Sequence, residues 1–295
     1  MIKNNNSIEK MSYIYLLSLL PLILFGFYKN GISLYTKGYV GIFGMLKPLL
    51  FILVGLIIGI LVNIIYEKII KKNKDNIREI IFSSFHPIYG TLVSSIISIN
   101  TNIFLFVIVT FIALLISKFI SVNKLNYVAL SGLIIFFIMN ITGKFSFLNA
   151  YEASNKFNMN AVDYLFGRGS GGLFTTNVIL LVISFIVLYN SKIYKKVIPI
   201  FATSAFIILT VIYCLATSNI TNIMNMLFTN GILFSFVFIA TEPISSSYTK
   251  KGMAIYGSVV GILTFLLYLI QPALSSLGAI LIASIFNSLI DLKFE

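Results

Sequence analysis

The 295-residue sequence has no tryptophan, a single cysteine and a single histidine. Cys214 cannot form an intrachain disulfide or hold an iron–sulfur cluster, because such clusters need about four cysteine ligands. His86 alone excludes a site with two histidine ligands, and the chain has neither a Walker loop nor a credible Ser-His-Asp set. Any electron path through this chain must therefore use organic cofactors or partner subunits.

Charged residues are also scarce, at 10% of the chain, whereas hydrophobic residues make up 58% and the mean hydropathy is +0.99. A soluble domain has about 25% charged and 45–50% apolar residues. The composition predicts an all-α integral membrane protein, with the lipid bilayer as one of its partners. The net charge of +12 would suggest nucleic acid in a soluble protein. Here it is better explained by lysine-rich loops, and we expect no nucleic-acid partner.

Apolar runs of about 17–25 residues can each cross a bilayer as a helix. The sequence contains about ten apolar runs of this length or slightly shorter. The third is diluted by His86, Pro87, Tyr89 and four serines, which predicts a broken or tilted helix. The predicted spans are 12–28, 41–64, 80–99, 103–120, 127–141, 172–189, 197–217, 223–240, 253–270 and 277–290.

The distribution of lysine and arginine predicts the orientation. With ten spans, 15 of the 21 basic residues fall on the side that holds both termini, and six fall on the opposite side. Because basic residues mark cytoplasmic loops, both termini are predicted to be cytoplasmic in a multi-pass protein of the cell membrane.

The long outer segment 142–171 divides the single membrane domain 1–295 into two five-helix halves, 1–141 and 172–295. Halves with an odd number of spans run through the membrane in opposite directions, as in transporters built from inverted repeats. Spacing alone gives this division weak support, because apolar runs can also alternate by chance.

Residues 238–252 read Phe-Ile-Ala-Thr-Glu-Pro-Ile-Ser-Ser-Ser-Tyr-Thr-Lys-Lys-Gly. Pro243 lacks a backbone N–H and disfavours helical geometry at Glu242, so the eighth span ends here. An acidic residue at the end of a membrane helix is costly unless it is partnered, hydrated or functional. Glu242 is therefore either a solvated helix stop or a functional group, and the residues alone leave both interpretations open.

Residues 241–252 resemble the T-D-P-[VI]-[TS]-x-[SP]-x-T-x-[KR]-G signature of two related membrane proteins. These are the D subunit of Rnf electron-transport complexes and the B subunit of the sodium-pumping NADH:quinone reductase. Thr241, Thr249 and Lys251-Gly252 match this signature, and Glu242 takes the place of its Asp. The resemblance extends over residues 231–291 and ends at Asp291, which matches the family's terminal acidic residue. It implies a pseudo-symmetric fold of ten helices, in agreement with the predicted halves.

The resemblance also implies a flavin. In this family the outer segment carries FMN, joined by a phosphoester to the Thr of an [ST]-[GA]-A-T motif. That motif is absent here, and the nearest local match is Ala153-Ser154-Asn155. Residues 165–176 resemble the family's Gly-rich approach to the sixth span, and such a turn before a helix can bind an anion. The implied cofactor contacts are Ser154, Arg168, Thr175 and Thr176. Without the resemblance, an ordinary polar loop and a simple tight turn are the more frequent explanations of these residues.

Three functions are compatible with these observations, and one of them is a flavin-handling membrane component of a different electron-export chain. The first is a membrane subunit of an Rnf- or Nqr-like complex that couples electron transfer to ion movement, with other membrane, flavin and iron–sulfur subunits as partners. In this hypothesis Thr241 and Glu242 lie on the ion pathway, and the isolated chain is a non-autonomous subunit of an oxidoreductase or translocase. The alternative is an inverted-repeat solute or ion permease of the same fold without a redox role, which the missing flavin motif favours.

Overall fold

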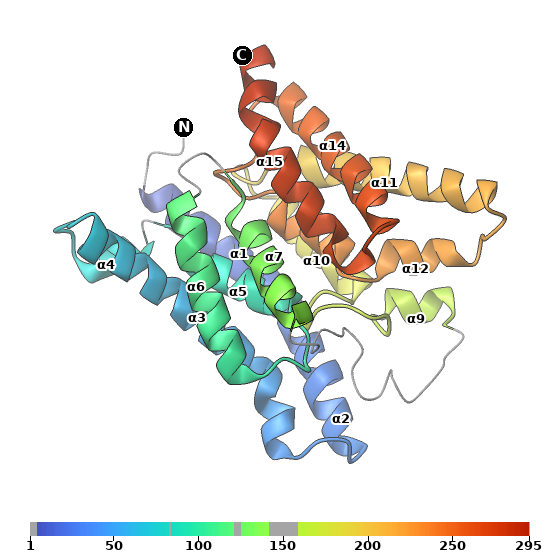
Figure 1. Ribbon diagram of the computed structural model, residues 1–295, viewed down its shortest axis with the longest axis horizontal. Helices are drawn as coiled ribbons and strands as arrows, with labels where there is room; N and C mark the ends of the chain where they lie inside the picture. Colours follow the sequence, from blue (N-terminus) through green and yellow to red (C-terminus); the bar gives the residue numbers. More distant parts are fainter. Residues whose placement is uncertain (1–4, 83, 121–124, 142–158, 295) are drawn as a thin grey trace.

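The computed structural model describes residues 5–82, 84–120, 125–141 and 159–294, and these contain helices but no strand (Figure 1). The prediction of an all-α chain with several membrane spans is confirmed. Within these described ranges, six helices are long and apolar enough to cross a membrane, and three further apolar helices are shorter. Ser154 and the rest of segment 142–158 lie outside the described residues.

The first group of helices contains the first five predicted spans. The fourth and fifth predictions, 103–120 and 127–141, agree with the observed bounds. The elements are α1 (Asn5–Phe27), η1 (Tyr28–Ile32), α2 (Ser33–Thr36), α3 (Ile42–Ile65), η2 (Tyr66–Ile70), α4 (Ile77–Phe82), α5 (His86–Ile96), α6 (Ile103–Ile120) and α7 (Tyr127–Ile141).

The second group follows the short helix α9 (Ala161–Leu165) of the outer segment. The last element of this second group, α15, ends at Phe294. The elements are α10 (Val178–Tyr189), α11 (Val197–Ala216), α12 (Asn222–Phe228), α13 (Ile232–Phe234), η4 (Ser235–Ile239), α14 (Lys250–Tyr268), η5 (Pro272–Leu274) and α15 (Ser275–Phe294).

Several predicted boundaries were wrong, among them the end of the second span, which continues past residue 64 through η2 to Ile70. The first span continues past Tyr28 through η1 and α2 to Thr36. The sixth begins at Val178 rather than 172, because residues 172–177 form a coil and the Asn177 side chain caps the helix by accepting a hydrogen bond from Leu180 N at 2.9 Å. The eighth is interrupted after Phe228, where Asn230 and Gly231 adopt positive φ angles of 58° and 68°. A left-handed pair cannot continue an α-helix.

The third span is broken, as its polar residues predict, into the short helix α4 and the helix α5. Helix α5 crosses α3 at close range: a Cβ atom at Gly55 would lie 2.5 Å from the Gly90 carbonyl oxygen and 2.7 Å from Ser94 Oγ. Glycine at both positions allows the two backbones to touch. All residues of α5 except Pro87 are buried, so this helix lies inside the bundle.

The same pairs of spans pack together in both groups. In the first, α3 packs on α5 and α6, and α7 packs on α5 and α6; in the second, α11 packs on η4 and α14, and α15 packs on η4 and α14. Contacts of α1 with α10 and of α7 with α15 join the groups. The start of α1 and the end of α15 lie at the same end of the molecule (Figure 1).

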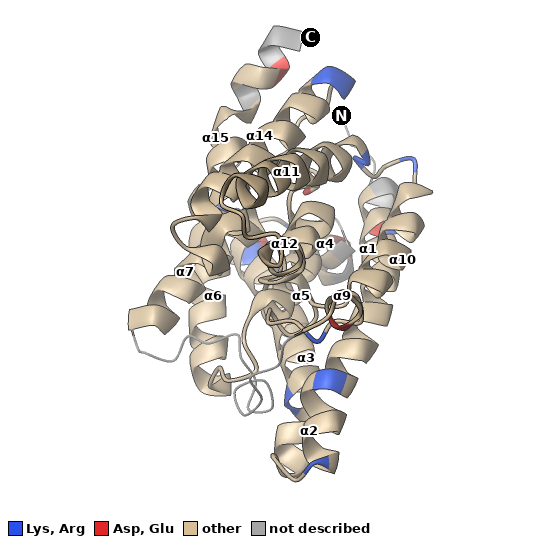
Figure 2. Cartoon of the chain, turned by 90° about the vertical axis from the view of Figure 1, so that its right-hand side faces the viewer, with Lys and Arg blue, Asp and Glu red and all other residues tan. Residues whose placement is uncertain are grey.

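The outer surface of the bundle is apolar along its helices. On α6 the side chains of Phe104, Ile108, Ile112 and Ile116 are exposed at intervals of four residues, which places them on one face. The long helices carry few charges over most of their length (Figure 2). By contrast, 61% of the residues of the candidate span Asn222–Ile239 are buried inside the protein, against 33–39% for the most apolar 18 residues of each other candidate span. The broken eighth span is therefore a central element of the fold.

Candidate functional site

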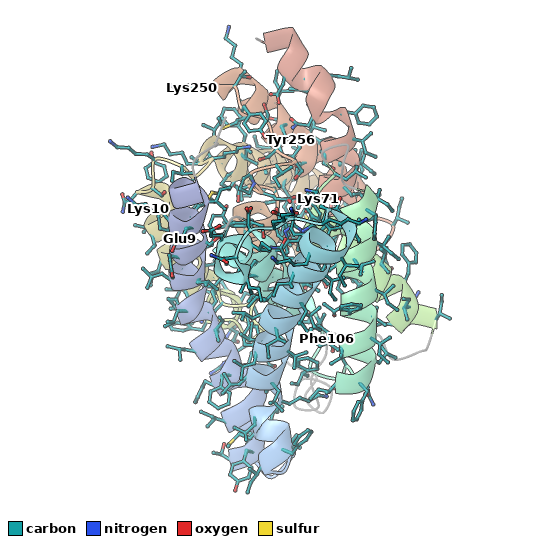
Figure 3. All side chains as sticks on the ribbon, turned by 90° about the vertical axis from the view of Figure 1, so that its left-hand side faces the viewer. Glu9, Lys10, Lys71, Phe106, Lys250 and Tyr256 are labelled. Carbon is teal, nitrogen blue, oxygen red and sulfur yellow. The ribbon has the colours of Figure 1, made fainter. Side chains whose placement is uncertain are left out.

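The coil 240–249 joins two helix ends at one side of the bundle. The preceding helix η4 ends at Ile239, and the Glu242 N–H turns back to the Ile239 carbonyl at 3.2 Å. Thr249 caps the next helix, because its hydroxyl accepts a hydrogen bond from Gly252 N at 3.0 Å. Lys250, Lys10 and Lys71 lie in the upper part of Figure 3, whereas Phe106 lies in the lower part. The coil is thus close to the end of the molecule that holds the termini.

Glu242 is buried within this coil, with 1% of its surface exposed. Its Oε2 atom accepts hydrogen bonds from Ser245 Oγ at 2.6 Å and from Tyr127 N, at the start of α7, at 3.3 Å. The other carboxyl oxygen, Oε1, has no hydrogen-bond partner among the described residues. Glu242 is therefore not a solvated helix stop. It is a buried carboxyl group with one oxygen available to a ligand, an arrangement that needs an explanation.

The side chains near Glu242 include further buried polar atoms without partners. The Tyr89 hydroxyl lies close enough to favour the ionised carboxyl, in a geometry short of a full hydrogen bond. Tyr89 also stacks on Tyr127 with ring centroids 4.9 Å apart, and His86 meets both rings edge-on at 5.2 Å. Within the described part of the chain, both ring nitrogens of His86 and the hydroxyl of Tyr256 lack partners. Buried groups of this kind commonly face water or an ion.

Burial raises the pKa of the Glu242 carboxyl to about 7. The residue lies between the candidate spans that end at Ile239 and begin at Lys250. Hydrogen bonds from Ser245 and the Tyr127 backbone, the nearby Tyr89 hydroxyl and the charge of Lys195 oppose this rise. A carboxyl group that titrates near neutral pH can exchange a proton for another cation at little cost.

Thr241 precedes Glu242 in the same coil and is fully buried. Its hydroxyl donates to the Val237 carbonyl at 2.7 Å and pairs with the Tyr15 hydroxyl at 3.0 Å. Since a hydroxyl has one proton to give, Tyr15 is the donor in the second bond. The structure brings both predicted ion-pathway residues together, but the Thr241 hydroxyl is fully engaged and holds α1 against the coil.

Sequence reasoning missed Asn126, which ties the first half to this coil. Its side-chain amide donates to the Ile239 carbonyl at 2.9 Å and to Ser245 Oγ at 3.0 Å, and its carbonyl oxygen caps α7 by accepting from Ala129 N at 2.9 Å. The only available signal was a polar residue directly before an apolar run, which is typical of an N-cap.

Asp291 near the end of α15 is a second buried carboxyl group facing the coil. Its Oδ1 atom accepts hydrogen bonds from the Ser247 hydroxyl and from Tyr248 N, the latter at 3.2 Å, whereas Oδ2 has no partner among the described residues. The terminal part of the family resemblance pointed to this residue, but sequence reasoning assigned it no role. Both described carboxyl groups at the coil thus hold one oxygen in a hydrogen bond and leave one open.

The implied flavin contacts do not assemble into one site among the described residues. Arg168 is exposed and forms an ion pair with Asp163 at 2.7 Å. Thr175 and Thr176 are buried, at 6% and 4% exposure. The Thr175 hydroxyl donates to the Gly172 carbonyl at 3.3 Å, and that of Thr176 accepts from Lys29 Nζ at 3.4 Å.

The coil around these threonines is shaped by backbone contacts. Leu173 N and Phe174 N donate to the carbonyls of Ile97 and Ser95, at 2.9 and 3.2 Å, so these two N–H groups are used by the protein. The described residues thus hold the side chains of Arg168, Thr175 and Thr176 in contacts with protein groups. They also contain no cluster of three or more His, Cys, Asp or Glu side chains that could hold a metal ion.

Comparison with known proteins extends the resemblance to the whole chain: the NQR2, RnfD, RnfE family matches residues 1–295. A stretch of 67 residues is 43% identical to the B subunit of the Na(+)-translocating NADH-quinone reductase of Chlamydia pneumoniae, covering 22% of this chain and 13% of the relative. The corresponding protein of Pseudomonas paraeruginosa is 37% identical over 67 residues, 22% of this chain and 17% of the relative.

A longer match, of 126 residues, is 29% identical to the D subunit of the ion-translocating oxidoreductase complex of Haemophilus ducreyi. It covers 41% of this chain and 36% of that relative. The matched segments thus span well under half the length of these curated relatives.

Proposed function

The chain belongs to the NQR2, RnfD, RnfE family, and on this premise we propose that it is a membrane subunit of an Rnf- or Nqr-like ion-translocating electron-transport complex. The relatives are named as subunits of NADH-quinone reductases and of an ion-translocating oxidoreductase complex. The proposed partners are other membrane subunits and subunits that carry flavin or iron–sulfur groups. The proposed location is the cell membrane, with both termini in the cytoplasm.

One observation carries the role in ion movement: Glu242 is buried in a coil between two helix ends and keeps Oε1 open. A membrane helix that is interrupted at a carboxyl group is a common way to build an ion site, because the unwound backbone supplies further oxygen atoms. When Glu242 is ionised, an uncompensated charge in a buried site is costly, so a cation at Oε1 would be stabilised strongly.

In this proposal Glu242 binds the moving cation and Thr241 positions the coil. The hydrogen bonds from Ser245 and from the backbone of Tyr127 hold Oε2, so that Oε1 is the coordinating atom. Protonation of Glu242 would release the cation, because a neutral carboxyl group attracts it far less. The tyrosines around the carboxyl group exclude bulk water from the site.

The test is cation uptake by membrane vesicles that contain the complete complex and are driven by oxidation of NADH. We expect Glu242→Gln to lower the uptake at least about tenfold, which corresponds to the loss of one charge-assisted contact, and Glu242→Asp to retain part of it. Asp75→Asn, in an exposed loop, is the matched control. Normal uptake in Glu242→Gln would contradict the assignment of the ion site.

The second candidate is a permease of the same fold without a redox role. It is favoured by the engagement of Arg168, Thr175 and Thr176 with protein partners, and for the same reason we derive no step through a flavin. Uptake by vesicles that contain this chain alone, without NADH, would support the permease. Uptake that requires NADH and the partner subunits would support the complex.

A further inference from the structure

Lys195 lies two residues before the start of α11 and is buried against the coil 240–249, with 7% of its surface exposed. Its ammonium group donates three hydrogen bonds, to the Pro243 carbonyl at 3.0 Å, the Ser246 carbonyl at 2.7 Å and Ser246 Oγ at 2.8 Å. An ammonium group has three protons, so each of them has an oxygen acceptor. All three acceptors come from the coil that also contains Glu242.

No carboxylate lies within 4.0 Å of this ammonium group among the described residues, whose ion pairs are all elsewhere. The charge faces neutral oxygen dipoles and, on another side, the ring of Tyr248, whose centroid is 4.1 Å away. Burial lowers the pKa of the Lys195 ammonium to about 7, against the opposing charges of Asp291 and Glu242. Carbonyl and hydroxyl oxygens that converge on a point charge are also the ligands with which proteins replace the hydration shell of an alkali-metal cation.

A similar contact occurs in the first half. Lys47, near the start of α3, donates to the Ile99 carbonyl at 2.6 Å. Ile99 lies in the coil that follows α5, just as Pro243 lies in the coil that follows η4. In each half, therefore, a lysine at the start of the second span binds a backbone carbonyl in the coil that follows the interrupted third span. One such contact could be an accident of packing, but the repetition links it to the interrupted helices.

We propose that the oxygens of Pro243 and Ser246 form a binding site for a monovalent alkali-metal cation, and that the Lys195 ammonium occupies it as a tethered cation. This inference rests on the proposed role of the coil in ion movement. When Lys195 loses its proton or swings away, the same three oxygens bind a free cation. The exchange keeps one positive charge beside the coil, so Glu242 and Asp291 are never both ionised without a cation nearby. The site differs from the Glu242 carboxyl in that it consists of neutral oxygens.

The experiment compares Lys195→Ala with Lys196→Ala in the purified chain in lipid nanodiscs. Thermal unfolding is measured in sodium, potassium and choline chloride at equal ionic strength. Removal of the tethered cation exposes the oxygens, so we expect sodium or potassium to raise the Tm of Lys195→Ala by about 3 °C over choline when the cation is in several-fold excess over its Kd. Lys196 lies over the Tyr189 ring instead, and its variant should show no such selectivity.

Equal Tm values of Lys195→Ala in all three salts would overturn the proposal and leave Lys195 as a structural clamp. Should this variant fail to fold, sodium binding to the wild-type chain is measured by calorimetry well below and well above pH 7. We expect binding at least about tenfold tighter at the higher pH, in Glu242→Gln as well as in the wild-type chain. Equal or absent binding at both pH values would refute the site. None of these measurements needs electron transfer or transport. The cation site at Lys195 can therefore be refuted while the proposed function stands, and the proposed function can be refuted while the cation site stands.

Discussion

The side-chain amide of Asn126, in the first half of the chain, donates to the carbonyl of Ile239, the last residue of η4 in the second half, at 2.9 Å. This bond joins the start of α7 to the coil that carries Glu242. We expect Asn126→Ala to lower the free energy of unfolding by about 2–3 kcal/mol, because it leaves buried acceptors without a donor and removes a helix cap.

Asn102 provides the matched control for this prediction. It caps α6 in the same way, accepting from Phe104 N at 2.9 Å, but it is exposed and its amide is not part of a contact between the halves. Asn102→Ala should cost about 1 kcal/mol. Denaturant titration of both variants would measure the difference, and equal losses would show that Asn126 is no more than a cap.

The stability of the chain should pass through a minimum near pH 7. The pKa of Glu242 is raised from 4.5 to about 7, so the unfolded chain releases this proton first and stability falls as the pH rises from about 4.5 to 7. The pKa of Lys195 is lowered from 10.5 to about 7, so the unfolded chain holds this proton longer and stability rises again from about pH 7 to 10.5.

Melting temperature measured against pH in lipid nanodiscs would test this profile. Glu242→Gln should remove the fall on the acid side, and Lys195→Met should remove the rise on the alkaline side. An unchanged acid limb in Glu242→Gln would mean that other groups control it.

Gly90→Ala should destabilise the crossing of α3 and α5. A Cβ atom at Gly90 would overlap the Gly55 carbonyl oxygen, which cannot move without its helix. The expected cost is about 1–3 kcal/mol. Gly278→Ala is the control, because the nearest atom to its Cβ is Leu267 Cδ1, at 3.0 Å and at the end of a flexible side chain. Thermal unfolding of the two variants should therefore differ clearly, and equal Tm values would argue against backbone contact at the crossing.

Cysteine labelling in intact cells would test the orientation. In a Cys214→Ala background, Lys192→Cys and Lys250→Cys should both be protected from a membrane-impermeant reagent, and Lys37→Cys should react with it. All three wild-type side chains are exposed, so access depends on the side of the membrane. Labelling of Lys192→Cys and Lys250→Cys from opposite sides would overturn the even number of spans.

Covalent flavin at Ser154 remains a prediction, which in-gel fluorescence of the denatured protein can test. A fluorescent band that is lost in Ser154→Ala would establish the attachment. Ser170→Ala, a serine near the start of the sixth predicted span, is the control and should keep the signal. A dark band for the wild-type chain would rule out covalent attachment, although a flavin bound without a covalent bond would be lost on denaturation.

The sequence predicted the membrane class, the position of most spans and the break around His86, because these depend on hydropathy and on local propensity. It did not predict the break at Asn230-Gly231, since an αL pair leaves little trace in an apolar run. Nor did it predict the start of α10 at Val178, which depends on contacts of residues 172–177 with α5.

Prediction of the site was limited in the same way. Glu242 and Thr241 were found through a local signature. Asn126, Lys195 and Asp291 contact the coil from positions 43 or more residues away in the sequence. Contacts at such separations depend on the tertiary fold, which one sequence does not specify in detail.

The contact of Gly55 with Gly90 has a mechanical consequence. Two helices whose backbones touch cannot slide along each other without first separating, so α3 and α5 move as one rigid body. A conformational change that admits an ion between the halves must therefore bend the chain at the ends of α5, in residues 84–85 or 97–102. Lys47 belongs to α3 and donates to the Ile99 carbonyl, so bending in residues 97–102 would break this hydrogen bond.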